Sequence, residues 1–179
     1  MGGQTVRGEA VVFILTVAAP PVFVHFSLLS EAQVMGRVGG RGLKLADFRH
    51  LNILLPYLFT ALWFLAGYAL ARLGEGMIAT IADHVYECVR ELYSAERARA
   101  FLYPPRVSGY VVITFILSRW LLSILWQRRY SRGKTVGYFD VLLIWLIPAL
   151  IYWVGTGTYI YSTLARYRPL YSLCGVHLF

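Results

Sequence analysis

Charged residues are scarce in this sequence. Asp, Glu, Lys and Arg make up 15% of its 179 residues, whereas apolar residues make up 58%. A soluble domain usually carries about a quarter charged residues, so this chain has too little charge to cover a surface that faces water. The apolar residues are also gathered into long blocks. The composition excludes an ordinary soluble domain and predicts an integral membrane protein, with residues 1–179 forming a single membrane domain.

Two residue types that mark particular chemistries are also rare. The cysteines, Cys88 and Cys174, lie far apart and match no metal-binding spacing. Asn52 is the only asparagine, and Ile53 and Leu54 follow it, so the sequence has no acceptor site for N-glycosylation. We therefore expect neither a cysteine-based metal site nor an attached glycan.

Basic residues outnumber acidic ones. Lys and Arg total 17 against nine Asp and Glu, and all but two of the basic residues are arginine. They lie at the ends of apolar runs and form no continuous patch, which argues against a nucleic-acid partner. Arginine binds phosphate through two hydrogen bonds at once. The charged loops are therefore expected to contact anionic lipid headgroups, with cardiolipin as the expected lipid.

Four stretches with little or no charge reach the roughly 20 residues that a helix needs to cross the hydrocarbon core. They are residues 10–29, 51–71, 107–127 and 141–165. An open sheet cannot cross lipid, because its edge N–H and C=O groups would lack partners. The sequence therefore predicts an all-α protein with about four transmembrane helices. Pro20 and Pro21 fall in the middle of the first one and predict a kink there.

Residues 76–103 differ from the four spans, because they combine an apolar stripe with many charges. The apolar residues recur three and four positions apart, which indicates one face of a helix. They are Ile78, Ile81, Ala82, Val85, Cys88, Val89 and Leu92. Helices on lipid surfaces favour Lys and Arg on their polar face, whereas this segment mixes both signs. We predict a separate amphipathic helix that lies on the membrane surface or docks on a partner.

The orientation in the membrane depends on the basic residues between the spans. Loops 30–50 and 128–139 together hold as many Lys and Arg residues as the opposite side of the membrane does. These two loops are shorter, so their positive charge is denser. The positive-inside rule then places them in the cytoplasm or matrix and both termini on the other side.

Arg119 is the one formal charge inside a predicted span. An arginine at that depth needs a carboxylate, phosphate or carbonyl partner. The predicted spans contain no acid, so the partner is expected to be another subunit or an anionic headgroup; the alternative is that Arg119 extends to the nearer interface. Four further arginines near span ends complete the predicted lipid- or partner-binding set. They are Arg49, Arg106, Arg128 and Arg129.

The histidines are the candidates for cofactor binding. His25 and His50 lie near the same end of the first two spans, and two histidines on neighbouring helices can ligate haem. His84 shares a helical face with Glu87 and Cys88, but metal sites in helix bundles repeat a Glu-x-x-His pair on two helices. We expect interfacial hydrogen bonding by His25 and His50, no metal, and no cofactor.

No catalytic constellation stands out in the sequence. The expected function is therefore that of an accessory structural subunit, not an enzyme, within a larger membrane complex. The expected membrane is the mitochondrial inner membrane, with a respiratory complex or ATP synthase as host. Two alternatives stay open: a small membrane enzyme that acts on a lipid or quinone through Arg119 with His25 or His50, and a haem- or quinone-binding anchor.

Overall fold

The computed structural model describes residues 2–38, 44–102 and 107–174, which fold into helices without any strand. The first helical run consists of α1 (Gly2–Phe13), a π-helical turn (Ile14–Ala18) and α2 (Ala19–Val38). A 3-10 turn (Leu45–Arg49) precedes α3 (Leu51–Leu92). The remaining helices are α4 (Ala95–Leu102), α5 (Ser108–Tyr130) and α6 (Tyr138–Leu173).

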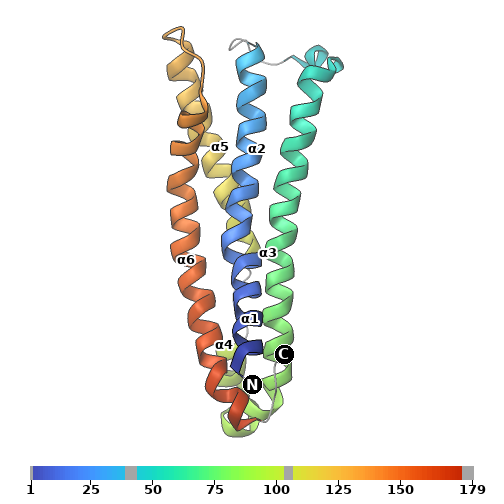
Figure 1. The fold of residues 1–179 in the computed structure, drawn as a ribbon, viewed down its shortest axis with the longest axis vertical. Coiled ribbons are helices and arrows are strands. Elements are labelled where there is room, and N and C mark those ends of the chain that lie inside the picture. The colour runs from blue at the N-terminus through green and yellow to red at the C-terminus, as the bar shows by residue number, and fades with distance from the viewer. Residues whose placement is uncertain (1, 39–43, 103–106, 175–179) are drawn as a thin grey trace.

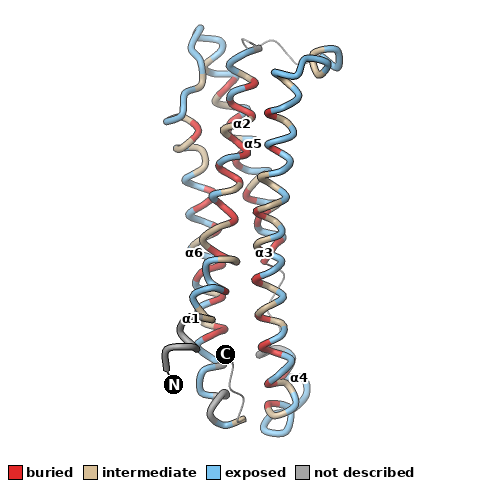
Figure 2. The backbone as a smooth tube through the Cα atoms, turned by 45° about the vertical axis from the view of Figure 1, so that its right-hand side comes forward, coloured by how far each residue is buried: buried red, intermediate tan, exposed pale blue. Residues whose placement is uncertain are grey.

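These elements form a long antiparallel bundle (Figure 1). The α1–α2 run rises from one end, α3 descends, α5 rises and α6 descends again. We call the end that holds both chain termini and α4 the terminal end, and the end that holds residues 44–50 and 131–137 the loop end. Helix α2 contacts α3, α5 and α6, and Figure 2 shows buried positions running along it. Val24, Leu28 and Val34 of α2 are fully buried.

The four predicted spans each correspond to a helix that is long and apolar enough to cross a membrane. The candidate spans are Gly8–Arg37, Leu51–Leu92, Ser108–Tyr130 and Tyr138–Arg166. All four extend beyond the predicted ranges, and the first and second extend furthest. The predicted helices are therefore confirmed in number and position, but their ends were placed too early.

The segment 76–103 is mostly helical as predicted, but the prediction that it forms a helix separate from the second span is wrong. Helix α3 continues without a break through 42 residues to Leu92, and only α4 is a separate helix in this segment. Most of the apolar stripe of the segment packs inside the bundle, although Leu92 is exposed. Val85 and Val89 belong to one buried cluster with Ala98 of α4, Val12 of α1 and Ile160 of α6. The charged residues of the segment do not interrupt the helix, because Glu and Arg are good helix formers.

Pro20 and Pro21 closely follow a π-helical turn in the first helical run, and the kink predicted there stays a prediction. The N–H of Ala19 donates to the carbonyl of Ile14, five residues back. The carbonyl of Thr16 would meet Pro20 in an α-helical pattern and Pro21 in a π-helical one, and neither proline has an N–H. The Tyr152 hydroxyl of α6 donates to this carbonyl at 2.5 Å. A side chain of another helix thus satisfies the carbonyl that the prolines leave open.

Helix α3 approaches the same region closely through Gly74. A Cβ atom added at Gly74 would overlap the side chain of Thr16. Gly67 lies about two helical turns before Gly74 in α3. A Cβ added at Gly67 would sit 3.1 Å from both the Phe23 Cβ and the Pro20 oxygen. Small residues at helix contacts allow backbones to approach in this way. Glycine at position 74 therefore lets α3 pack directly on the π-helical turn.

Replacing Gly74 by Ala should destabilise the bundle, because Thr16 would have to move within a packed interior. Overpacking of this kind typically costs about 1–3 kcal/mol. The free energy of unfolding of the purified chain, measured in detergent by circular dichroism during denaturant titration, reports the loss.

Gly76 provides a matched control in the same helix. No atom lies within 4 Å of a Cβ added there, and Ala is favoured over Gly in a helix interior by up to about 1 kcal/mol. Gly76→Ala should leave stability unchanged or raise it. Equal effects of the two substitutions would show that the close approach at Gly74 does not exist.

Candidate functional site

Arg119 forms an ion pair with a carboxylate of its own chain. Its Nε donates to Glu31 Oε1 at 3.0 Å, which joins α5 to α2. The Glu31 side chain is 4% exposed, whereas that of Arg119 is 52% exposed on the outside of the bundle. The pair therefore combines a buried acid with a base that also faces outward.

This contact corrects the expectation that the chain supplies no acid at the depth of Arg119. The first span was predicted to end at Leu29, so Glu31 was assigned to a loop. In the structure α2 continues to Val38 and carries Glu31 into the bundle. The prediction that the chain itself supplies no carboxylate for Arg119 is therefore wrong, and contact of Arg119 with another subunit or an anionic lipid headgroup stays a prediction.

Further polar groups lie in the same part of α2 and α5. The hydroxyl groups of Ser27 and Ser118 and the second carboxylate oxygen of Glu31 are buried and have no hydrogen-bond partner among the described residues. Ser27 precedes Glu31 by one helical turn, and Ser118 is adjacent to Arg119. The α2–α5 interface thus holds more polar groups than the ion pair alone requires, and a buried water is the usual partner of such groups.

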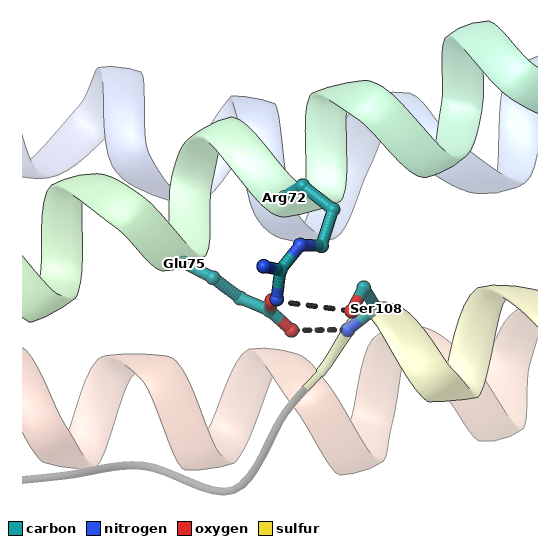
Figure 3. A network of polar contacts seen from close by, with 3 residues as sticks. All are labelled: Arg72, Glu75 and Ser108. Atoms are coloured by element: carbon teal, nitrogen blue, oxygen red, sulfur yellow. Dashed lines mark hydrogen bonds and ion pairs between the residues drawn. The ribbon is translucent and has the colours of Figure 1, made fainter.

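A second charged network joins α3 to the start of α5 (Figure 3). Glu75 accepts hydrogen bonds from the backbone N–H of Ser108 and, at 3.1 Å, from its hydroxyl. Arg72 donates to the same carboxylate at 2.8 Å. The first N–H groups of a helix lack partners within it, and a negative charge there is favourable. Glu75 therefore caps α5 from a neighbouring helix, a role that the sequence analysis missed because Glu75 lies beyond the predicted end of the second span.

A basic pocket lies at the loop end of α5. It has a volume of about 380 Å³. Its lining residues are Leu125, Arg128, Arg129, Arg132 and Lys134. The structure thus brings the predicted Arg128 and Arg129 together with two basic residues that the sequence analysis did not single out.

The other two arginines of the predicted set lie elsewhere. Arg49 is exposed at the end of the 3-10 turn before α3, and it does not line the basic pocket. Arg106 lies outside the described residues.

His25 and His50 are not brought together. His25 is 7% exposed and packs against the rings of Tyr138 and Trp145, whereas His50 is exposed at the start of α3. Arg37 of α2 donates a hydrogen bond to the carbonyl of Asn52 at 2.6 Å. Arg37 therefore lies beside the start of α3. His25 lies roughly 18 Å further down α2, since each helical residue adds about 1.5 Å. This separation is too large for axial ligation of one haem.

The two cysteines form a disulfide between α3 and the end of α6. Cys88 and Cys174 are joined across a sequence separation of 86 residues, with their Cα atoms 5.8 Å apart. The sequence spacing gave no sign of this pairing, because it depends on two antiparallel helices whose ends meet. Cys88 is thereby unavailable as a metal ligand beside His84, whose Nδ1 lies 2.7 Å from the carbonyl of Thr80.

A groove between α1 and α6 lies near the terminal end. It has a volume of about 530 Å³. Its lining residues are Glu9, Ala10, Phe13, Ile14, Tyr161, Leu164, Ala165 and Arg168. Its one ion pair joins Arg168 to Glu9 at 2.9 Å. The rest of the wall is mainly apolar, and no group of polar side chains converges inside it.

Together these features define a class: an all-helical antiparallel bundle with four helices suited to crossing a membrane and with charged contacts that join the helices. Among the residues that the structure describes, no group of three or more His, Cys, Asp or Glu could hold a metal ion. No protein-family model, curated protein or solved structure matches the chain.

Arg119→Leu should destabilise the isolated chain, because it leaves Glu31 buried without its cation. Removing one partner of a fully buried pair typically costs about 3–5 kcal/mol, and the loss here should be smaller because Arg119 is half exposed. Glu31→Leu should cost less, since Arg119 is half exposed and can reach polar surroundings.

The double substitution separates the pair from other effects. Glu31→Leu combined with Arg119→Leu should be more stable than Arg119→Leu alone, because no unpaired charge remains inside the bundle. The measurement is a double-mutant cycle on the free energy of unfolding in detergent. Strictly additive effects of the two substitutions would show that the side chains do not interact.

Proposed function

We propose that this chain is an integral membrane protein that serves as an accessory structural subunit of a larger membrane complex. The observation that carries the proposal is the position of Arg119. Half of its side chain is exposed on the outer face of α5, inside a helix suited to crossing a membrane. A guanidinium that faces hydrocarbon costs at least ~2.5–3.5 kcal/mol on insertion scales. A neighbouring subunit or a lipid headgroup at this face would supply partners for its remaining donors.

The length of the bundle also supports a role among partner proteins. Helix α3 has 42 residues, which corresponds to roughly 63 Å, whereas a bilayer including its headgroups is about 40–45 Å thick. The part of α3 that ends at Leu92, together with α4, would therefore extend beyond the membrane at the terminal end. This part exposes both acidic and basic residues, among them Glu87 and Arg90, which form an exposed pair with each other. A mixed-charge extension of this kind suits contact with another protein more than contact with lipid.

The two ends of the bundle differ in a way that supports one orientation. The disulfide lies at the terminal end, and disulfides persist in oxidising compartments. The basic pocket lies at the loop end, and positive loops favour the cytoplasm or matrix. These two independent features support the same arrangement. We propose that the loop end faces the cytoplasm or matrix and the terminal end faces an oxidising compartment.

The finer proposal is a mitochondrial inner membrane location, with a respiratory complex or ATP synthase as host. Its support is the arginine-rich composition, the lack of an N-glycosylation acceptor and the difference between the two ends. The terminal end would then face the intermembrane space. The separation of His25 from His50 gives no support to the alternative of a haem-binding anchor.

The orientation can be tested by labelling single added cysteines in sealed membrane vesicles with a membrane-impermeant maleimide. Ser131 lies at the loop end and Ser94 between α3 and α4, and both are exposed. Ser131→Cys should label from the side opposite to Ser94→Cys, because an odd number of crossings separates them. The unaltered chain is the control, and it should label only after reduction, since its cysteines are paired. Labelling of both positions from the same side would contradict the proposed arrangement.

The structural role predicts a specific pattern of loss in native membranes. Depleting the chain should lower the amount of an assembled complex, which native electrophoresis and its co-migrating proteins would identify. Replacing His25, His50 or His84 by Ala should leave turnover per assembled complex unchanged. A histidine whose loss abolishes turnover while assembly stays normal would instead favour the enzyme or cofactor-anchor alternative.

A further inference from the structure

The basic pocket at the loop end is built by a sharp turn that returns the chain to the end of α5. Helix α5 ends at Tyr130, and Gly133 adopts a positive φ of 68° that other residues rarely tolerate. The N–H of Lys134 then donates to the carbonyl of Arg129 at 3.0 Å. Lys134 and Arg132 are thereby held beside Arg128 and Arg129. The pocket depends on this turn and not on the helix alone.

An internal ion pair fixes one wall of the pocket. Arg129 bonds to Asp140 of α6 at 2.7 Å, and the other oxygen of Asp140 accepts the N–H of Gly137 at 3.0 Å. The Asp140 side chain is 14% exposed. Arg129 is therefore neutralised and held in place, and the ends of α5 and α6 are joined beside the pocket.

The remaining three basic side chains give the pocket an excess of positive charge. Arg128, Arg132 and Lys134 form no ion pair within the part of the chain that the structure describes. Cations at a helix C-terminus are favoured by the helix dipole, but that effect is modest at an exposed site. Like charges gathered around one cavity repel one another until an anion enters. The arrangement thus favours an anion with more than one negative charge.

The position of the pocket indicates the kind of anion. Leu125 lines the pocket, and the next residue in sequence, Trp126, is buried, so the apolar part of α5 ends there. Tyr130 and Tyr138 are exposed at the same end, as aromatic residues are at the level of lipid headgroups. Arginine binds phosphate oxygens through two parallel hydrogen bonds. Clusters of Lys and Arg beside the end of a membrane helix attract anionic lipid headgroups.

We propose that this pocket binds the headgroup of an anionic lipid that carries two phosphate groups, with Arg128, Arg132 and Lys134 contacting the phosphates. Arg129 positions the site through Asp140 and does not itself neutralise the lipid. The acyl chains would lie along the exposed apolar face of α5. The inference rests on the proposed location in a membrane and names the lipid class that this part of the chain would bind.

The test uses the purified full chain in a neutral detergent and measures thermal stabilisation by added lipids. A lipid with two phosphate groups, such as cardiolipin, should raise the Tm. It should also bind at least tenfold more tightly than an anionic lipid with one phosphate group. Phosphatidylcholine should have no effect. Inorganic phosphate should also have none, because without acyl chains it lacks the apolar contacts.

Two triple variants remove the same charge from opposite ends of the molecule. Arg128→Gln, Arg132→Gln and Lys134→Gln together should weaken cardiolipin binding at least tenfold. The control variant, with Arg90→Gln, Arg97→Gln and Arg99→Gln, removes three exposed arginines at the terminal end and should change binding less than twofold. Circular dichroism before heating verifies that both variants are folded.

Three results would overturn the proposal. Equal losses in the two variants would mean that total charge, and not the pocket, attracts the lipid. Stabilisation by inorganic phosphate as strong as that by cardiolipin would mean a site for a free anion. Equal binding of lipids with one and two phosphates would remove the proposed specificity. Because this test uses the isolated chain, it can fail while depletion still lowers complex assembly, and the two proposals can be judged separately.

Discussion

The carbonyl group of Thr16 cannot be satisfied within its own helix, because Pro20 and Pro21 occupy the positions that would donate to it. The Tyr152 hydroxyl satisfies it from α6, and the indole of Trp145, also on α6, donates to the carbonyl of Pro21 at 2.6 Å. Helix α3 packs against the same turn through Gly74. Three helical runs therefore meet where the prolines interrupt the hydrogen bonding. The defect that the prolines create becomes the place where α6 and α3 are positioned against the central helix.

The charged contacts lie on either side of this meeting point along the bundle. Glu31 and Arg119 join α2 to α5 toward the loop end, and Glu75 joins α3 to the start of α5 toward the terminal end. In an apolar surrounding, a polar group costs free energy unless it is paired. The contacts therefore restrict how far the helices can slide or rotate, because a shift would separate a buried carboxylate from its partner. Apolar packing alone would tolerate such shifts more easily.

The sequence allowed the four long helices to be predicted, because the length of an apolar run is a direct measure of its ability to cross a membrane. It did not allow their ends to be placed, since a helix continues where apolar character stops. Glu31 and Glu75 were missed for that reason, although each lies within a few residues of a predicted span. The disulfide depends on the meeting of α3 and α6, which no local pattern encodes. The contact between Tyr152 and Thr16 joins residues that are 136 positions apart, and no local pattern encodes it either.

The two ends of the bundle are chemically different, and each end carries its own link to α6. At the terminal end the disulfide joins the ends of α3 and α6. A cross-link over a loop of this length stabilises the folded state by about 4.6 kcal/mol when only the lost entropy of the unfolded chain is counted. At the loop end the ion pair between Arg129 and Asp140 joins α5 to α6. Helix α6 is thus fixed by a covalent bond at one end and by an ion pair at the other, with Tyr152 between them. A reducing environment would remove the first of these links and leave the second. The fold therefore keeps both links on α6 only while the disulfide stays oxidised.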